Sequence, residues 1–140
     1  MIFFDTDICI DILHGNYSLK SFKQNFLSNE KFAITTPSIF ELYMGYYKLE
    51  FGKNRLNEMH LKKERRSIQK LIQGLYIFSL DEEAARRSAK IYRHLESIGM
   101  SLDLFDCLIA SIILANNFSN LITRNEKHFQ RIEGINIIKP

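Results

Sequence analysis

The sequence predicts an α/β fold in which a mainly parallel sheet of about five short strands is covered by helices on both faces. Short apolar runs alternate along the chain with longer stretches of helical spacing, which is the order expected of parallel strands joined by crossover helices. The stretch 104–118 is apolar nearly all round, so it is predicted to be a helix of the interior. The length of 140 residues fits one domain, and we expect residues 1–140 to form it.

Five apolar runs are predicted to be strands because each is short and is bounded by polar or turn-forming residues. In chain order they are 2–4, 32–35, 75–78, 121–123 and 135–138. The runs are nearly continuous in apolar character and do not alternate with polar residues. This pattern favours strands that are covered on both faces.

The segments between the strands have helical spacing and recognisable ends. In chain order, the predicted helices are 8–13, 19–27, 36–51, 53–73, 81–97 and 104–118, followed by a helical turn at 126–131. Thr36 is a suitable N-cap, with Pro37 at the first helical position. Gly52 and Gly74 end two of the helices, and the acids that begin at Asp81 favour a helix N-terminus.

The charge of the chain permits a nucleic-acid partner without requiring one. The net charge is only +3, but residues 48–73 hold eight basic side chains against three acidic ones. Cys9 and Cys107 lie in apolar runs and form no disulfide framework, which suits a reducing compartment. Because the start of the chain does not resemble a signal peptide and no apolar run reaches ~18 residues, we expect a cytoplasmic protein without a membrane span.

Polar side chains gather where the predicted strands end. In open parallel sheets, ligands bind beyond the carboxyl ends of the strands, and these ends meet at one edge. The polar residues expected at this edge are Asp5, Asp7, Thr35, Thr36, Ser38, Glu41, Asp103, Asp106, Thr123, Arg124 and Asn125. Several carboxylates at one edge repel one another, and a bound cation or a raised pKa is the usual resolution.

Oxygen ligands of this kind suit Mg²⁺ or Mn²⁺ rather than zinc. The four histidines show no zinc-ligand spacing with the two cysteines. A divalent ion held by carboxylates polarises a phosphate oxygen and lowers the pKa of a bound water. The pattern therefore indicates hydrolysis of phosphodiesters.

Structural explanations remain open for several of these residues. Asp103 and Asp106 have the spacing of an N-cap and an N3 acid, and Asp5 resembles an ordinary loop acid. Asn125 could simply shape a turn, and His128 is interpreted as packed or exposed rather than as a ligand. Glu41 is harder to explain structurally, because its neighbours are apolar or aromatic and Gly45, one turn on, leaves room for a ligand.

Four short motifs follow one another along the chain. They are residues 2–10 (IFFDTDICI), 41–45 (ELYMG), 106–111 (DCLIAS) and 121–125 (LITRN), the last followed by Phe129. Together they resemble the PIN domain, and within it the VapC-type toxins of bacterial toxin–antitoxin pairs. The first two look like that family's strand-Asp-Thr-Asn/Asp opening and its Glu-x-x-x-Gly motif, and the other two are similar to its last two motifs. The resemblance covers essentially the whole chain.

The resemblance implies a Mg²⁺- or Mn²⁺-dependent endoribonuclease that forms a homodimer and is inhibited by a cognate antitoxin. It implies metal-ligand roles for Asp5, Glu41 and Asp106, whereas Thr6, Thr123 and Asn125 would line the site. The family often has an acid just before the final Phe, where this chain has His128. Either three acids suffice, or Asp7 or Asp103 supplies the fourth charge, or a second metal is weakly held; a substitute acid is the favoured explanation.

Two other functions compete with this interpretation. Asp5-x-Asp7 after a strand resembles the nucleophile motif of haloacid-dehalogenase-type phosphatases, with Asp5 as nucleophile and Thr35 as the hydroxyl of the second strand. Cys9 does not fit that motif, and the Glu41 and Asn125 motifs would have no function in it. A non-cleaving, RNA-binding or dimeric interaction module of PIN fold is the second alternative, and His128 is the residue that supports it.

Two surfaces have open interpretations. The basic segment 53–73 is either a solvated face with pairs such as Glu58–Lys62 or a contact surface for RNA phosphates. The aromatic side chains Phe40, Tyr43, Tyr46 and Tyr47 exceed what one helix needs for its own core. The surplus is expected to line a homodimer seam or an antitoxin groove.

Overall fold

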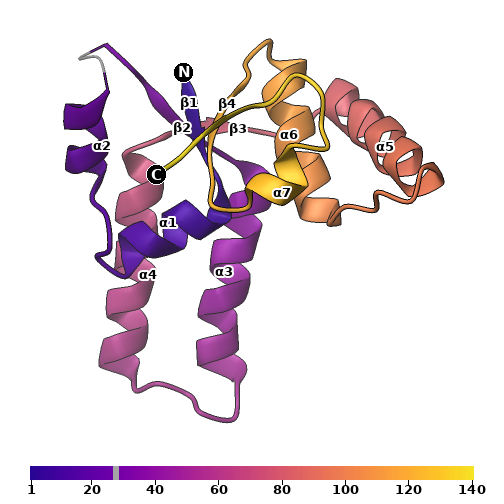
Figure 1. Cartoon of the computed structure of the whole chain (residues 1–140). Helices are drawn as coiled ribbons and strands as arrows, with labels where there is room; N and C mark the ends of the chain where they lie inside the picture. Colours follow the sequence, from indigo (N-terminus) through magenta and orange to yellow (C-terminus); the bar gives the residue numbers. More distant parts are fainter. Residues whose placement is uncertain (27–28) are drawn as a thin grey trace.

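The computed structural model describes residues 1–26 and 29–140 and contains one five-stranded sheet (Figure 1). The strand order is β3-β2-β1-β4-β5, and every neighbouring pair is parallel. The strands are β1 (Ile2–Phe4), β2 (Phe32–Thr35), β3 (Tyr76–Phe78), β4 (Asn120–Ile122) and β5 (Asn136–Ile138). The predicted α/β class and parallel sheet are therefore confirmed.

Helices cover both faces of the sheet, as predicted (Figure 1). They are α1 (Thr6–Leu13), α2 (Leu19–Asn25), α3 (Thr36–Phe51), α4 (Glu58–Gln73), α5 (Glu82–Ser97), α6 (Leu104–Ala115) and α7 (Glu126–Phe129). Leu27, which the sequence placed at the end of the second helix, lies outside the described residues.

Successive residues of the central strands pack on opposite faces of the sheet, in two separate apolar cores. Phe4 and Ile122 pack with residues of α1 to α4 on one face, whereas Phe3 and Leu121 pack with residues of α5 to α7 on the other. All four side chains are fully buried, and burying an apolar side chain of this size contributes about 1.5–3 kcal/mol. The central strands are therefore held from both sides, which fixes the positions of the residues that follow them.

Some helix boundaries differ from the sequence prediction for identifiable reasons. The predicted helix 53–73 begins only at Glu58, because Asn57 is its N-cap and accepts a hydrogen bond from the backbone N–H of His60 at 2.9 Å. Helix α6 ends at Ala115 rather than residue 118, and Asn117 has the left-handed backbone conformation with φ +59°. Thr35, not Thr36, is the N-cap of α3.

The strand order reverses at the carboxyl ends of β1 and β4. From β1 the chain proceeds to β2 and β3 on one side of the sheet, and later to β4 and β5 on the other. A ligand site in an open α/β sheet lies at the point where the strand order reverses in this way. In the described part of the chain, the structure contains no helix that is both long and apolar enough for a membrane span.

Candidate active site at the carboxyl edge of the sheet

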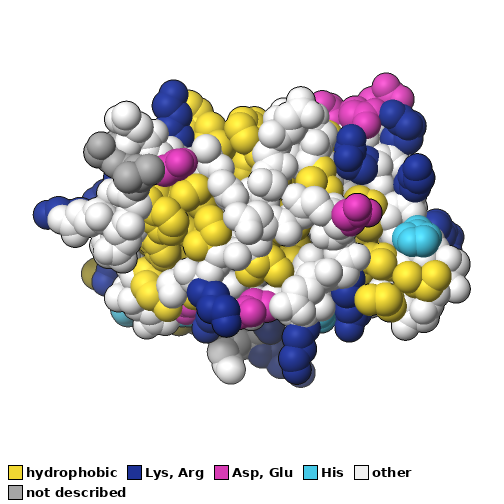
Figure 2. Space-filling model, turned by 45° about the horizontal axis from the view of Figure 1, so that its top comes forward, with side chains coloured by type: hydrophobic (Ala, Val, Ile, Leu, Met, Phe, Trp, Pro, Cys, Tyr) yellow, Lys and Arg dark blue, Asp and Glu magenta, His cyan; other side chains and the backbone are white. Residues whose placement is uncertain are grey.

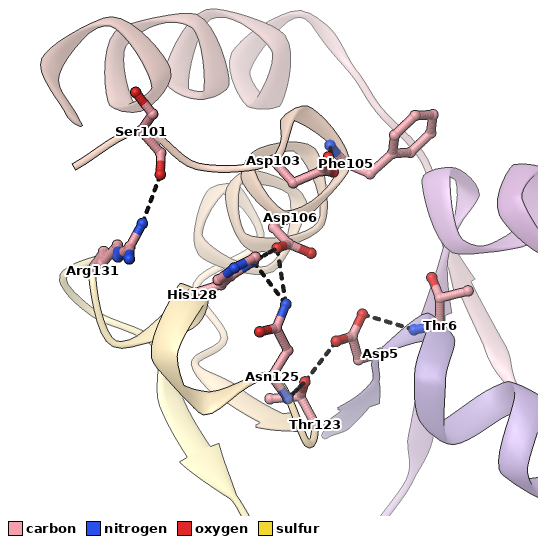
Figure 3. A network of polar contacts seen from close by, with 10 residues as sticks. All are labelled: Asp5, Thr6, Ser101, Asp103, Phe105, Asp106, Thr123, Asn125, His128 and Arg131. Atoms are coloured by element: carbon pink, nitrogen blue, oxygen red, sulfur yellow. Dashed lines mark hydrogen bonds and ion pairs between the residues drawn. The ribbon is translucent and has the colours of Figure 1, made fainter. Parts of the chain in front are cut away.

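Asp5 lies at this reversal point, directly after β1, and its side chain is buried. It is the N-cap of α1: its Oδ1 accepts a hydrogen bond from the backbone N–H of Thr6 at 2.7 Å. Its Oδ2 accepts a second one, at 2.6 Å, from the hydroxyl of Thr123, which directly follows the neighbouring strand β4 (Figure 3). Burial raises the pKa of Asp5 to about 7, helped by the nearby charges of Asp7 and Asp106 and opposed by these hydrogen bonds.

Glu41 reaches the same edge from the second turn of α3. The hydroxyl of Thr6 donates a hydrogen bond of 2.5 Å to Glu41 Oε2, so Thr6 contacts both Asp5 and Glu41. The Glu41 side chain is only partly buried. Burial raises its pKa, and the charges of Asp106 and Asp103 act in the same direction.

Asp106 approaches from the first turn of α6. Its Oδ2 lies 2.6 Å from Nδ1 of His128 and accepts a hydrogen bond from Nδ2 of Asn125 at 3.2 Å (Figure 3). Burial raises the pKa of Asp106, whereas the hydrogen bond and charge of His128 oppose this shift. Thr123 and Asn125 are therefore in direct contact with the predicted acids, as their positions at the end of the fourth strand indicated.

His128 takes part in this network, and its side chain is 40% exposed. Its contact with Asp106 joins α7 to α6 across 22 positions of sequence. The loop before α6 and the residues after α7 are joined again where Arg131 donates a hydrogen bond to the backbone carbonyl of Ser101 at 2.6 Å. Sequence reasoning missed the contact because no local spacing relates His128 to Asp106.

The two additional candidate acids have other partners. Asp103 is the N-cap of α6 and accepts a hydrogen bond from the backbone N–H of Phe105 at 2.8 Å, which confirms its capping interpretation. Asp7 Oδ2 accepts a hydrogen bond from the backbone N–H of Arg124 at 3.0 Å. The Arg124 guanidinium also lies 3.1 Å from Asp11, a buried acid that sequence reasoning did not single out although it follows Asp7 by one helical turn.

The donor chemistry of this edge fits a divalent cation. Burial raises the pKa of Asp5, Glu41 and Asp106, and the charge of Asp106 adds to the shift at the other two. Asp7 Oδ1 is buried and has no hydrogen-bond partner among the described residues. As the side chains stand, however, no three acidic, histidine or cysteine side chains of the described residues form a ready-made metal site.

Two further surfaces were singled out from the sequence. Along α3, the side chains of Phe40, Met44, Tyr47 and Phe51 form an exposed row, here called the α3 stripe, with exposed fractions from 48 to 79%. Of the four aromatic residues singled out from the sequence, Tyr46 is buried and Tyr43 packs against the core, whereas Phe40 and Tyr47 are exposed. On α4 the Lys and Arg side chains are exposed, but Glu58 pairs with Arg55 at 2.7 Å rather than with Lys62.

A separate hollow lies between α5 and the residues after α7. Its volume is about 580 Å³, and its lining includes Arg86, Arg87, Lys90 and the apolar side chains of Ile91 and Leu95. Figure 2 shows Lys and Arg side chains gathered on the right-hand side of the molecule, where α5 lies. None of the predicted site residues lines this hollow.

Comparisons with known proteins agree on the fold. A family model for the PIN domain matches residues 2–135. Ribonuclease VapC1 from Methanocaldococcus jannaschii is 40% identical over 57 residues, which are 41% of this chain and 41% of that protein. The matched segment therefore spans about two fifths of the length of this curated relative.

Two solved structures resemble the chain over nearly its full length. One is VapBC2 from Rickettsia felis bound to a DNA fragment from its promoter, with a TM-score of 0.80, 23% identity, and coverage of 100% of this chain and 99% of that chain. The other is DNA-bound VapBC from Salmonella typhimurium, with a TM-score of 0.78, 21% identity, and coverage of 99% and 98%. At these identities the likeness concerns the fold.

Proposed function

The chain belongs to the PIN-domain family, and from this membership we propose that it is a metal-dependent endoribonuclease acting as the toxin of a VapBC-type toxin–antitoxin pair. The proposal includes hydrolysis of RNA phosphodiester bonds, Mg²⁺ or Mn²⁺ as the cofactor, and residues 1–140 as one PIN domain. The segment related to Ribonuclease VapC1 supports the choice of RNA as substrate.

One observation carries the proposal: Asp5, Glu41 and Asp106 extend from three different elements toward one edge, and burial raises the pKa of each. Burying carboxylates near one another is costly unless a cation or a proton compensates the charge. A fold that keeps three of them at the reversal point of its sheet holds a site suited to a divalent cation.

The proposed ligands are Asp5, Glu41 and Asp106, with Mg²⁺ or Mn²⁺ supplying polarisation of a phosphate oxygen and a lowered pKa of bound water. Thr6 orients Glu41 through the hydrogen bond from its hydroxyl, and Thr123 orients Asp5 in the same way. Asn125 donates a hydrogen bond to Asp106 and thereby orients its carboxylate. Asp7 and Asp103 are secondary candidates, because Arg124 and the N-terminus of α6 already engage them.

The phosphatase alternative is not favoured. The family model for the PIN domain matches residues 2–135, and a phosphatase with Asp5 as nucleophile would leave Glu41 and Asn125 without a function. Thr35, the hydroxyl that this alternative assigns to the second strand, is buried, with its Oγ1 3.1 Å from the Ser38 hydroxyl. The family membership does not favour the non-cleaving alternative either, and a cleavage assay separates it from the proposal.

We propose two protein partners, a second copy of the chain and a cognate antitoxin. The solved relatives named above are VapBC complexes, and the α3 stripe leaves apolar side chains exposed on this chain. Such a row is more apolar than a surface that stays in water. Light scattering should give the mass of a dimer at micromolar concentration, and the product of the neighbouring gene should co-purify; a monomer that binds no such product would contradict this part.

Metal-dependent cleavage is the test of the main proposal. Purified, metal-free protein should leave a mixed-sequence RNA intact in EDTA and cleave it when Mn²⁺ or Mg²⁺ is added. The products should be internal fragments rather than mononucleotides released from one end. Cleavage that persists in EDTA would refute metal dependence, and an inert protein with both metals would favour the non-cleaving module.

A further inference from the structure

We propose that His128 is a ligand of the metal bound at this edge, and that its imidazole nitrogen makes the site prefer Mn²⁺ over Mg²⁺. The inference rests on the proposed metal-dependent function. It differs from the substitute acid favoured by sequence reasoning, because it assigns the missing ligand to the residue that stands at that position.

The geometry places the Nδ1 atom of His128 among ligand atoms. Nδ1 lies 2.6 Å from Oδ2 of Asp106 and 2.8 Å from Nδ2 of Asn125, and all three side chains point toward one another in Figure 3. In an octahedral site with ligands at about 2.1 Å, neighbouring ligand atoms lie about 3.0 Å apart. The His128–Asp106 pair therefore has to open by only a few tenths of an ångström to share an ion.

The tautomer of His128 decides what these contacts are. If Nδ1 carries a hydrogen, it donates that hydrogen to Oδ2 of Asp106. If Nδ1 carries none, its lone pair faces Asp106 and Asn125 and is available to a cation. In this second state Asn125 still donates a hydrogen bond to Asp106.

The position of His128 is fixed, and it is open to an ion from solvent. The neighbouring side chain of Phe129 is fully buried, and the backbone N–H of His128 donates to the carbonyl of Asn125 at 3.1 Å. The His128 side chain itself is 40% exposed, compared with 13% for Asp106. A rigid backbone with a half-open imidazole is suited to capturing an ion without rearranging α7.

The chemistry of imidazole gives the direction of the preference. Mg²⁺ is bound almost entirely by oxygen and gives up its water ligands reluctantly. First-row transition metals bind nitrogen ligands more readily, and Mn²⁺ is the member of that series that also accepts a carboxylate-rich site. Replacing one carboxylate of such a site by imidazole therefore weakens the binding of Mg²⁺ more than the binding of Mn²⁺.

The test measures metal binding rather than activity. Calorimetric titration of metal-free protein with MnCl₂ and with MgCl₂ gives the ratio of the two affinities for wild type and for His128→Asp. We expect the ratio to favour Mn²⁺ in wild type and to fall by at least about tenfold in His128→Asp. His94→Asp, at an exposed histidine of α5, is the matched control and should keep the wild-type ratio.

A spectroscopic measurement identifies the ligand itself and does not depend on whether a variant folds. Electron spin-echo envelope modulation of the Mn²⁺-loaded wild type should show coupling to a histidine nitrogen, which changes when the protein is labelled with ¹⁵N-histidine. Absence of this coupling, or an unchanged affinity ratio in His128→Asp, overturns the inference and leaves the proposed function standing. Failure of the wild type to bind either metal would instead refute the proposed metal dependence.

Discussion

The carboxyl edge of the sheet and the outer face of α4 both carry unbalanced charge, but the desolvation penalty differs greatly between the two regions. At the edge, Asp5 is almost fully buried and its pKa is raised to about 7. On α4, Lys62, Lys63 and Arg66 are exposed around a shallow hollow of about 310 Å³. Exposed charges cost little, whereas buried ones are retained against a desolvation penalty. The difference indicates that the edge needs a functional explanation and the α4 face does not yet require one.

The largest expected effect concerns the edge. Asp5→Asn, Glu41→Gln and Asp106→Asn should each lower the rate of RNA cleavage by at least about 100-fold, because each removes a charge that holds the metal. Circular dichroism should show that the fold survives. Asp81→Asn is the matched control, since the Asp81 side chain caps α5 by accepting a hydrogen bond from the backbone N–H of Ala84 and Asn caps equally well. Full activity of Asp106→Asn would show that the buried charge at the edge is not needed for cleavage, and the contrast with the α4 face would lose its functional meaning.

The second effect is a dependence of stability on pH. The ordinary pKa of 3.8 for Asp5 is raised to about 7 in the folded state, so the metal-free folded protein holds a proton that the unfolded chain has released between these values. The free energy of unfolding should therefore be highest at low pH and fall as the pH rises from about 4 to 7. Asp5→Asn removes this penalty and should be more stable than wild type at pH 8 by up to about 4 kcal/mol, because the pKa of Asp5 rises from 3.8 to about 7 on folding.

Urea unfolding in EDTA at pH 5 and pH 8 measures this difference. Burial also raises the pKa values of Asp7, Glu41 and Asp106. The free energy of unfolding of Asp5→Asn is therefore still expected to fall from pH 5 to pH 8, but by less than in wild type. If the free energy of unfolding changes equally between pH 5 and pH 8 in wild type and Asp5→Asn, Asp5 is not the group that causes the pH dependence.

The third effect concerns the α4 face. If Lys62 and Lys63 contact RNA phosphates, replacing both by Glu in the cleavage-deficient Asp106→Asn background should weaken RNA binding. The slope of log affinity against log salt should become shallower by about 1.4, which is 0.7 for each of two lost contacts with a single strand. Lys90→Glu, on α5, is the control. An unchanged slope would leave α4 as a solvated face, and stability should stay within about 0.5 kcal/mol in either case.

The smallest effect is expected at Gly45. A Cβ at this position would meet no atom of the chain within 4 Å, and alanine is favoured over glycine in a helix by about 1 kcal/mol. Gly45→Ala should therefore stabilise the isolated protein, as thermal unfolding would show. If a partner or RNA approaches α3 closely here, the same variant should bind it more weakly. Unchanged binding would mean that neither RNA nor a protein partner comes close to α3 at Gly45.

Much of the fold could be predicted because it depends on local pattern. The strands Ile2–Phe4 and Phe32–Thr35 were predicted to the residue, and the resemblance to the PIN domain is confirmed. The helix boundaries near Asn57 and Asn117 were wrong, because a cap and a left-handed residue decide them against an otherwise helical composition. Parallel topology was enough to predict that residues after β1 and β4 would meet.

Contacts within the site were less accessible from the sequence. The His128–Asp106 contact and the Arg124–Asp11 ion pair join positions far apart in the chain, and both depend on how α7 and the end of β4 pack against α6 and α1. No spacing rule contains that information. The roles of Asp5, Glu41 and Asp106 as ligands remain predictions from chemistry, whereas their placement at one edge is a structural observation.

The helix-capping hydrogen bond of Asp5 affects how mutagenesis at this position should be interpreted. Alanine would lose the ligand charge and also leave the first backbone amide of α1 without its acceptor, a local defect of about 1 kcal/mol. An alanine scan would therefore attribute to catalysis a loss that partly belongs to helix initiation. Asparagine keeps an oxygen for that amide, so only the isosteric exchange separates the two contributions.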